Sequence, residues 1–310
     1  MKLGWHAPSF PVDGTAAADF PAQVERGLEA VGGRFDSVWF DDHLHPWADF
    51  VAADTPTLEC LTTIAYLAGR HPSLTFGSTV VCQSFRNAGL LAKMAANLHW
   101  LTGGRFVLGI GAGWLADEYR AYGYDFPGAA ERIAQLEEAV QVVRAAWTQS
   151  PASADGDHHR LDGAYAEPRP DPPPPLLIGG GGEKRTLRVV ARHADWWNIP
   201  GGTPETYAHK LDVLRVHCQQ VGRSYDDIVK TWSAEVVAVA ATETRAREIA
   251  DATPYTDDNP IVGTPDSVVE QLRPYLDLGV EHLIVRLVDF PSTEGLRLFA
   301  DEVAPNLGEA

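Results

Sequence analysis

The segment Phe106-Val107-Leu108-Gly109-Ile110-Gly111-Ala112-Gly113-Trp114 sets the pattern for the rest of the chain. It begins as an apolar β-type run and ends on glycines at alternate positions. Apolar residues at helical spacing lie on both sides of it, at Leu90, Leu91, Met94, Leu98 and Leu101 before it and at Ile133, Leu136, Val140, Val143 and Trp147 after it. Each set forms one apolar stripe that can pack on a sheet. A helix, a strand and a helix in this order predict repeated βα units around a parallel sheet.

The same alternation runs along the whole chain. β-type runs occupy residues 2–6, 37–41, 74–81, 106–110, 176–178, 194–199, 228–240 and 282–287. Alternation of this kind favours a closed (β/α)8 TIM barrel over an open sheet, because open sheets of eight strands are uncommon. A length of 310 residues suits one barrel domain over residues 1–310. Seven prolines mark residues 150–175 as a surface insertion, a linker or a lid.

The composition narrows the class of partner. The chain has 42 acidic and 25 basic residues, a net charge of -17, which disfavours nucleic acid and anionic membranes as partners. Three widely spaced cysteines, Cys60, Cys82 and Cys218, suit a reducing compartment. The N-terminus lacks the features of a signal peptide, and no apolar run is long enough to span a bilayer. We therefore expect a cytoplasmic protein with a small-molecule partner.

Catalytic groups of a barrel gather after the strands, which draws attention to Asp42 and His43. An imidazole beside a carboxylate can accept or donate a proton near neutral pH. The alternative is structural, with His43 bonded to a loop and Asp42 capping a turn. Asp41 and His45 are expected to be turn or surface groups. A metal site formed by Asp42, His43 and His45 lacks a remote third ligand.

Two glycine-rich segments are candidates for cofactor binding. Gly109, Gly111 and Gly113 have no Cβ and so let a flat ring or a phosphate approach the backbone. Trp114 occupies the third glycine position of the G-x-G-x-x-G dinucleotide fingerprint, which excludes that motif.

The second segment precedes a helix and consists of Gly179, Gly180, Gly181 and Gly182. It can offer several backbone N–H groups to a phosphate, and Lys184, Arg185 and Arg188 add positive charge nearby. The alternative is a flexible turn between a strand and a helix.

As an ordered set, these motifs resemble the luciferase-like flavin and deazaflavin oxidoreductases over about residues 1–290. The matching segments are Trp39-Phe40-Asp41-Asp42-His43, Leu90 to Leu98, Leu101-Thr102-Gly103-Gly104-Arg105-Phe106, Gly109 to Trp114, Leu177 to Gly182, Ala194-Asp195-Trp196-Trp197-Asn198 and Gly263-Thr264-Pro265-Asp266. The resemblance implies a bacterial-luciferase-like TIM barrel. It also implies a non-prolyl cis peptide between Thr79 and Val80, supporting the face of the cofactor ring.

The segment Asp42-His43-Leu44-His45-Pro46-Trp47 is similar to the Asp-His-x-x-Pro-Trp motif of sugar-phosphate dehydrogenases that use the 5-deazaflavin coenzyme F420. The similarity implies that His43 handles a proton, that Asp42 orients contacts to the ring and that Trp47 forms a pocket wall. We expect Trp5 and Trp114 to line the same pocket.

Two departures from those dehydrogenases are clear. Trp114 stands where they carry an acidic residue, which counts against glucose 6-phosphate as the substrate. Arg86-Asn87-Ala88 replaces their Arg-x-Pro, so the loop after the third strand differs.

The leading expectation is hydride transfer between F420 and a small organic substrate, with the redox chemistry supplied by the cofactor. The alternative is a two-component FMN-dependent monooxygenase that receives reduced FMN from a flavin reductase. A further alternative is a flavin-binding protein without catalytic activity. Because family members are often dimers, the resemblance also allows a homodimer.

Overall fold

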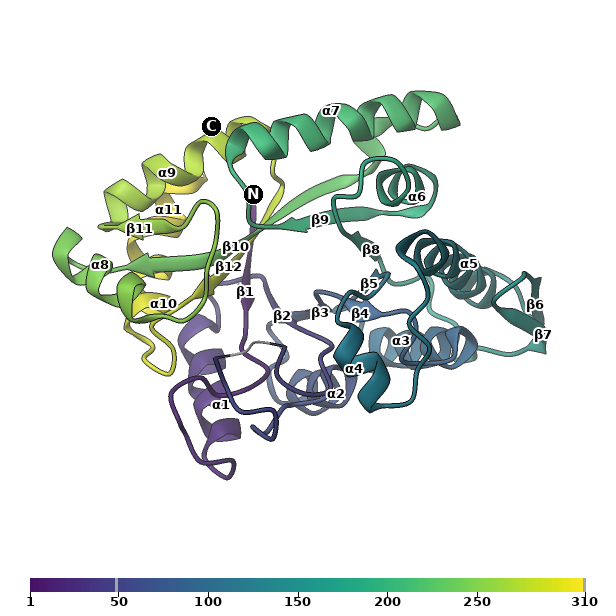
Figure 1. Cartoon of the computed structure of the whole chain (residues 1–310), viewed down its shortest axis with the longest axis horizontal. Helices are drawn as coiled ribbons and strands as arrows, with labels where there is room; N and C mark the ends of the chain where they lie inside the picture. The colour runs from purple at the N-terminus through teal and green to yellow at the C-terminus, as the bar shows by residue number, and fades with distance from the viewer. Residues whose placement is uncertain (48–49, 309–310) are drawn as a thin grey trace.

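Eight parallel strands close into a barrel in the computed structural model, which describes residues 1–47 and 50–308 (Figure 1). Each strand pairs with the next, and β12 pairs back with β1, where Lys2 lies opposite His282. The predicted (β/α)8 barrel is confirmed. Its strands are β1 (Lys2–His6), β2 (Ser37–Phe40), β3 (Thr75–Ser78), β5 (Phe106–Gly111), β8 (Leu176–Gly179), β9 (Trp196–Pro200), β10 (Val229–Val239) and β12 (His282–Leu287).

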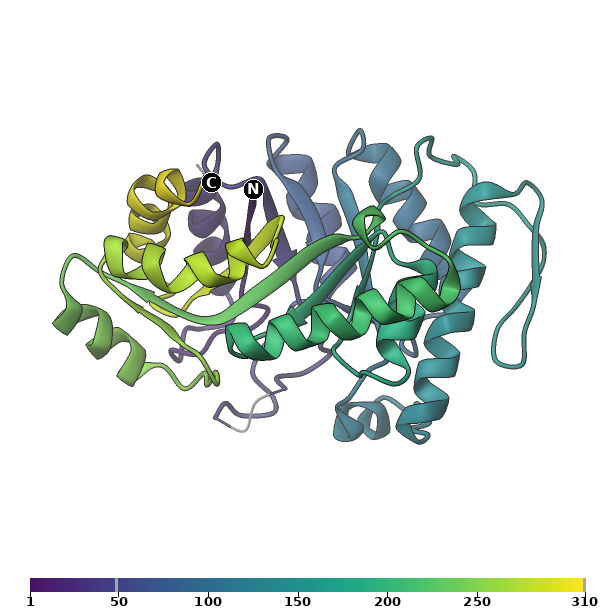
Figure 2. The same cartoon turned by 90° about the horizontal axis from the view of Figure 1, so that it is seen from above.

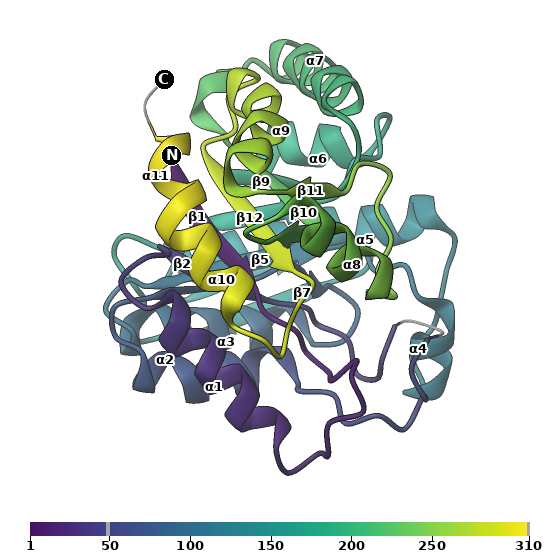
Figure 3. The same cartoon turned by 90° about the vertical axis from the view of Figure 1, so that its left-hand side faces the viewer.

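Helices surround the barrel, and the last ones pack beside the first, so that the two ends of the chain meet (Figure 3). They are α1 (Phe20–Val31), α2 (Cys60–Arg70), α3 (Ala88–Leu101), α4 (Ala116–Ala121), α5 (Ala129–Thr148), α6 (Thr186–His193), α7 (Pro204–Val221), α8 (Glu243–Ala252), α9 (Pro265–Asp277), α10 (Glu294–Leu298) and α11 (Ala304–Leu307). A 3-10 turn (Tyr225–Asp227) and a π-helical turn (Phe299–Val303) complete the set. Within the described residues, no helix has both the length and the apolar character that crossing a membrane requires.

The ends of the helices follow local chemistry. The Thr203 side chain accepts a hydrogen bond from the Thr206 N–H at the start of α7, and α7 ends at Gly222 in the left-handed conformation. Helix α9 begins at Pro265 and continues through Pro274 as one helix.

The third predicted strand is interrupted. β3 ends at Ser78, the Thr79–Val80 peptide is cis as expected, and a short strand β4 (Val81–Cys82) then pairs with β5. Outside the barrel, β11 (Ile261–Gly263) adds to the edge of β10.

The proline-rich insertion forms an antiparallel hairpin of β6 (Ala152–Asp155) and β7 (Arg160–Ala164). It lies at the side of the barrel against α5, where Glu138 accepts hydrogen bonds from the backbone N–H groups of His158 and His159 (Figure 2). None of residues 150–175 lines the central pocket, so the insertion does not act as its lid in this conformation.

The barrel interior contains Trp39, Val107, Leu177 and Ile284, while a larger core lies between the strands and the helices. Helix α3 packs through Leu91 and Leu98. The prediction that Leu90 and Leu101 face the sheet is wrong, because these side chains are 54% and 73% exposed.

Candidate active site

A pocket of about 530 Å³ opens at the carboxyl ends of the barrel strands. All eight strands contribute a residue: six lie at or next to a strand end, Asn198 lies within β9, and Glu235 lies at the register shift of β10. Barrel enzymes bind their ligands at this end of the strands. These residues are His6, Asp41, Thr79, Gly111, Gly179, Asn198, Glu235 and Arg286.

His43 lies in this pocket and is held by Glu118, a buried residue of α4. The His43 Nδ1 atom is 3.1 Å from Glu118 Oε2, and the other oxygen of Glu118 accepts a hydrogen bond from the Leu44 N–H. A carboxylate at Nδ1 favours the tautomer with the proton on that nitrogen, which leaves a lone pair on Nε2. Nε2 has no hydrogen-bond partner among the described residues. The imidazole is thus oriented and has one nitrogen available to a ligand.

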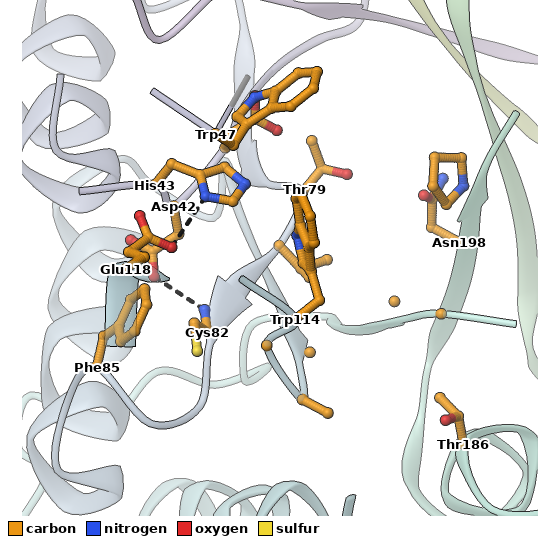
Figure 4. Close-up of a pocket in the computed structure, with 18 of the residues that line it drawn as sticks. Asp42, His43, Trp47, Thr79, Cys82, Phe85, Trp114, Glu118, Thr186 and Asn198 are labelled. Atoms are coloured by element: carbon orange, nitrogen blue, oxygen red, sulfur yellow. Dashed lines mark hydrogen bonds and ion pairs between the residues drawn. The ribbon is translucent and has the colours of Figure 1, made fainter. Parts of the chain in front are cut away.

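Two indole rings flank this imidazole (Figure 4). The ring centroids of Trp47 and Trp114 lie 6.2 and 5.8 Å from that of His43. Trp47 also packs against Tyr255, whereas Trp114 is 60% exposed at the rim. The predicted pocket positions of Trp47 and Trp114 are therefore observed.

The third predicted pocket tryptophan, Trp5, lies elsewhere. Successive residues of a strand point to opposite sides, and Gly4 and His6 of β1 face the barrel interior. Trp5 consequently points outward, where a Cβ on Gly27 of α1 would come within 2.3 Å of its ring. Trp5 is a core residue between β1 and α1, so its assignment to the pocket was wrong.

Asp42 lines the pocket, but its carboxylate is committed to Arg86. Two Arg86 nitrogens each donate to one Asp42 oxygen at 2.7 Å, and the Cys82 N–H donates at 3.0 Å. Burial raises the pKa of Asp42 above its usual value, although Arg86 acts in the opposite direction. Arg86 also contacts Glu59. Asp42 therefore ties the segment after β2 to β4, and Glu118 is the carboxylate that orients His43.

Three of the glycines predicted to bind the cofactor, Gly109, Gly111 and Gly179, lie around Val80. A Cβ on Gly111 or Gly179 would lie 2.6 or 2.8 Å from a Val80 methyl carbon, and a Cβ on Gly109 would lie 1.9 Å from the Ser78 carbonyl oxygen. These glycines make room for the bulge at Thr79 and Val80, which then enters the pocket. Gly111 and Gly179 line the pocket, whereas Gly109 lies behind the bulge and does not.

Gly113, the last of that run, has a φ of 75°. A Cβ there would lie 2.0 Å from the Tyr119 hydroxyl oxygen. Gly113 lines the pocket too, so a side chain is excluded both by the backbone conformation and by Tyr119.

The glycine run after β8 is only partly available. The Gly180 N–H donates to the Asn198 carbonyl oxygen at 2.9 Å, so it cannot also bind a phosphate. The N–H groups of Gly181 and Gly182 have no acceptor within the described residues, but these two glycines do not line the pocket, whereas Gly179 and Gly180 do. Lys184 and Arg185 are exposed and lie outside the pocket lining.

Arg132 is a cation in the pocket lining that the sequence analysis missed. It lies in the first turn of α5, where its Nε donates to the Gly113 carbonyl oxygen at 3.2 Å and its guanidinium stacks 4.0 Å from the Phe126 ring centroid. Its place in the first turn of the second helix after the Gly-x-Gly-x-Gly segment was the available signal.

A second group of missed residues consists of His6, Asp41, Glu235 and Arg286, here named the charge network. All four line the pocket, and Asp41 is buried. The expectation that Asp41 is a turn or surface group was therefore wrong. His45 is half-buried, and its ring stacks on Tyr122 at a centroid distance of 6.4 Å. Among residues 1–47 and 50–308, no cluster of three or more His, Cys, Asp or Glu side chains is arranged to hold a metal ion.

Residues 1–260 match the family described as Luciferase-like monooxygenase. A barrel with a cis-peptide bulge and a strand-end histidine fits this match, and the chain belongs to that family. The protein is accordingly a luciferase-like oxidoreductase with a TIM-barrel fold, as the resemblance implied.

Individual relatives and solved structures are similar to this protein along nearly the whole chain. The chain is 27% identical to an F420-dependent glucose-6-phosphate dehydrogenase of Amycolatopsis mediterranei (strain U-32), over 92% of this chain and 93% of that protein. A solved F420-dependent secondary alcohol dehydrogenase in complex with an F420-acetone adduct has a TM-score of 0.82 at 19% identity, covering 99% of both chains. The monooxygenase RslO1 from Streptomyces bottropensis has a TM-score of 0.81 at 20% identity, covering 98% of this chain and 99% of that one.

Proposed function

We propose that the protein is an F420-dependent oxidoreductase that transfers a hydride to or from a small organic substrate. The observation that carries the proposal is the His43–Glu118 pair inside a pocket whose wall contains the Thr79–Val80 bulge. The F420-dependent relatives and the Asp-His-x-x-Pro-Trp similarity support this cofactor. The alternative is a flavin-binding protein without catalytic activity, and turnover of any substrate with bound F420 would exclude it.

The pocket fits a flat ring system with a phosphate-bearing tail. Val80 is half-buried and presents an apolar surface between Gly111 and Gly179, against which a ring can pack. Gly181 and Gly182 follow the pocket residue Gly180 in the loop before α6, and their N–H groups, which have no acceptor among the described residues, can donate to phosphate oxygens. These residues would hold the cofactor.

Arg132 and the α5 N-terminus lie in the same pocket lining. A guanidinium and a helix N-terminus both attract negative charge. We propose that they assist in binding the anionic part of the cofactor.

When bound, F420 supplies the carbon that accepts or donates the hydride. The task left to the protein is the proton. With its Nδ1 proton held by Glu118, His43 can accept the proton of a substrate hydroxyl at Nε2 during oxidation, and it can return that proton in the reverse direction. Trp47 and Trp114 form apolar walls beside this nitrogen and limit the access of water.

We expect F420 to bind more tightly than FMN, because the segment from Asp42 to Trp47 is similar to the F420-dependent branch. Fluorescence titration of the purified protein with each cofactor measures this directly. Micromolar binding of FMN with no F420 signal would favour the alternative, a two-component FMN-dependent monooxygenase. That alternative requires a partner flavin reductase, and oxygen consumption with reduced FMN would then be the next measurement.

Gly181→Val is expected to weaken F420 binding by about tenfold or more, because a branched side chain would cover the free N–H groups of the loop. The fold should persist, since a Cβ at Gly181 comes no closer than 3.4 Å to another atom. The same titration measures the affinity, and circular dichroism checks the fold. Gly69→Val on α2, where a Cβ would have no atom within 4 Å, is the matched control. Unchanged affinity in Gly181→Val would refute the loop assignment.

We also propose that the protein forms a homodimer through α3. Leu90 and Leu101 are separated by three helical turns and lie on the same exposed side of that helix, with Trp100 beside them at 59% exposure. Leu101→Glu should convert a dimer to a monomer in sedimentation velocity, because it places a charge in the apolar contact. A monomeric wild-type protein at micromolar concentration would rule this out.

A further inference from the structure

The charge network lies at the ends of β1, β2 and β12 and, through Glu235, at the register shift inside β10, and these four strands are neighbours in the barrel wall. It is connected to the His43 region through aromatic rings. The Arg286 guanidinium lies 4.9 Å from the Tyr255 ring centroid, and Tyr255 packs at 5.8 Å against Trp47. A ligand that reacts beside His43 therefore has this network within the same pocket.

Arg286 is shared between two carboxylates. Its Nε donates to Glu235 Oε2 at 3.1 Å, and a terminal nitrogen lies 3.5 Å from Asp41 Oδ2. His6 Nε2 is 2.9 Å from the other oxygen of Asp41, and His6 Nδ1 is 3.6 Å from Glu235. The positive charge of Arg286 is therefore already balanced inside the protein.

Both carboxylates of the network are ionised at neutral pH. Burial raises the pKa of Asp41 and of Glu235, but the neighbouring His6 and Arg286 together lower both pKa values by more. Burial lowers the pKa of Arg286, while Glu235 and Asp41 raise it well above its usual value. Burial and Arg286 lower the pKa of His6, but Asp41 and Glu235 together raise it by more. With Arg286 and a protonated His6 against two carboxylates, the network carries no net positive charge that could attract an anion.

One acceptor in the network has no donor. Among the described residues, Asp41 Oδ2 is a buried oxygen without a hydrogen-bond partner, and the Asp41 side chain is 10% exposed in the pocket wall. This oxygen lies beneath the pocket surface, 3.5 Å from a terminal nitrogen of Arg286. The Glu235 side chain is 22% exposed in the pocket wall, so it is the carboxylate of the network that can accept a hydrogen from a ligand.

We propose that the charge network selects a substrate that places a neutral, hydroxyl-bearing group at this end of the pocket and discriminates against a phosphate or carboxylate there. The inference rests on the proposed function, which makes this pocket the substrate site. A substrate hydroxyl can donate to the exposed part of the Glu235 carboxylate. An anionic group would approach two ionised carboxylates, and the arginine between them is already neutralised.

The test compares D-glucose with glucose 6-phosphate, a pair that differs by one phosphate, using isothermal titration calorimetry with and without saturating F420. The wild-type protein should bind the phosphate ester no more tightly than the neutral sugar. Glu235→Gln removes one negative charge and should shift the preference toward glucose 6-phosphate by about tenfold or more. Asp41→Asn should shift it in the same direction, and it provides a second variant if the first does not fold.

Glu29→Gln is the matched control, because it makes the same change of charge at an exposed position of α1 outside the pocket. The glycine loop after β8 is unchanged in the wild type and in all three variants. Any binding of the sugar phosphate to that loop therefore contributes equally and cancels when the variants are compared with the wild type. A tenfold wild-type preference for glucose 6-phosphate, an unchanged preference in both variants, or undetectable binding of both sugars to every protein would overturn the inference. Failure to bind F420 would instead contradict the proposed function. The two outcomes are distinguishable, because the sugar titrations without F420 still test the role of the charge network.

Discussion

His43→Ala is expected to lower turnover by about 10²–10⁴-fold while leaving F420 affinity within a few-fold, the usual result of losing a positioned general acid or base. The imidazole is the group that Glu118 orients beside the Thr79–Val80 bulge, and its free Nε2 is the atom assigned to the proton. Steady-state kinetics with the substrate found by screening give kcat, and fluorescence titration gives the affinity for the cofactor. Added imidazole should restore part of the lost rate.

Glu118 provides the control for this result, because it acts through His43 as a positioning residue. Glu118→Gln keeps an acceptor for the Nδ1 proton and should retain more of kcat than Glu118→Ala, with similar KM values for both. A purely structural Glu118 would give equal losses of kcat in the two variants. His43→Ala with nearly full turnover, or with no response to imidazole, would make His43 a structural histidine.

Local patterns were sufficient to predict the barrel and the position of His43. Each strand and helix is encoded by its own periodicity, and the carboxyl ends of parallel strands meet at one face whatever the loops do. His43 directly follows β2, so strand order alone placed it at the pocket. Trp114 also comes shortly after a strand end, whereas the pocket position of Trp47 was implied by the Asp-His-x-x-Pro-Trp similarity.

The partners of these residues could not be predicted in the same way. Glu118 is 75 residues from His43, and the adjacent Asp42 was the obvious choice until Arg86 proved to hold it. Whether a carboxylate points to the histidine or away from it depends on side-chain directions after the strand, which periodicity does not determine. The charge network was missed for the same reason, because its members come from four separate strands.

Trp5 is a different kind of error. Alternation along β1 places Gly4 and His6 on the inside, and a Cβ at Gly4 would lie 2.5 Å from the Trp39 ring nitrogen. Applying the two-residue period to β1 would have directed His6 to the pocket and Trp5 to the helix layer. The alternation along β1 was therefore enough to place Trp5 correctly. The prediction failed because it favoured an aromatic residue as a pocket wall over this alternation.

Arg86→Met is expected to destabilise the fold by about 3–5 kcal/mol, the usual cost of removing one partner of a buried ion pair. Arg86 and Asp42 have side chains only 10% and 1% exposed, and two hydrogen bonds of 2.7 Å join them. Without the guanidinium, the Asp42 carboxylate keeps only the Cys82 N–H among these contacts. Urea denaturation of the variant and the wild type at neutral pH measures the difference in free energy of unfolding.

The same pair gives a test with a definite sign in pH. Burial already raises the pKa of Asp42, and loss of Arg86, which lowers it, should raise this pKa further in the folded variant. A carboxyl group with a raised folded-state pKa destabilises the fold above that pKa, and the penalty disappears as the pH falls through it. The deficit of Arg86→Met should therefore be largest near pH 8 and shrink toward about pH 5. Adding Asp42→Asn should recover much of the loss and abolish this pH dependence, because no buried charge then remains unpaired. A deficit that is independent of pH, and that the second substitution does not relieve, would show that Arg86 stabilises the fold through packing or through Glu59 instead.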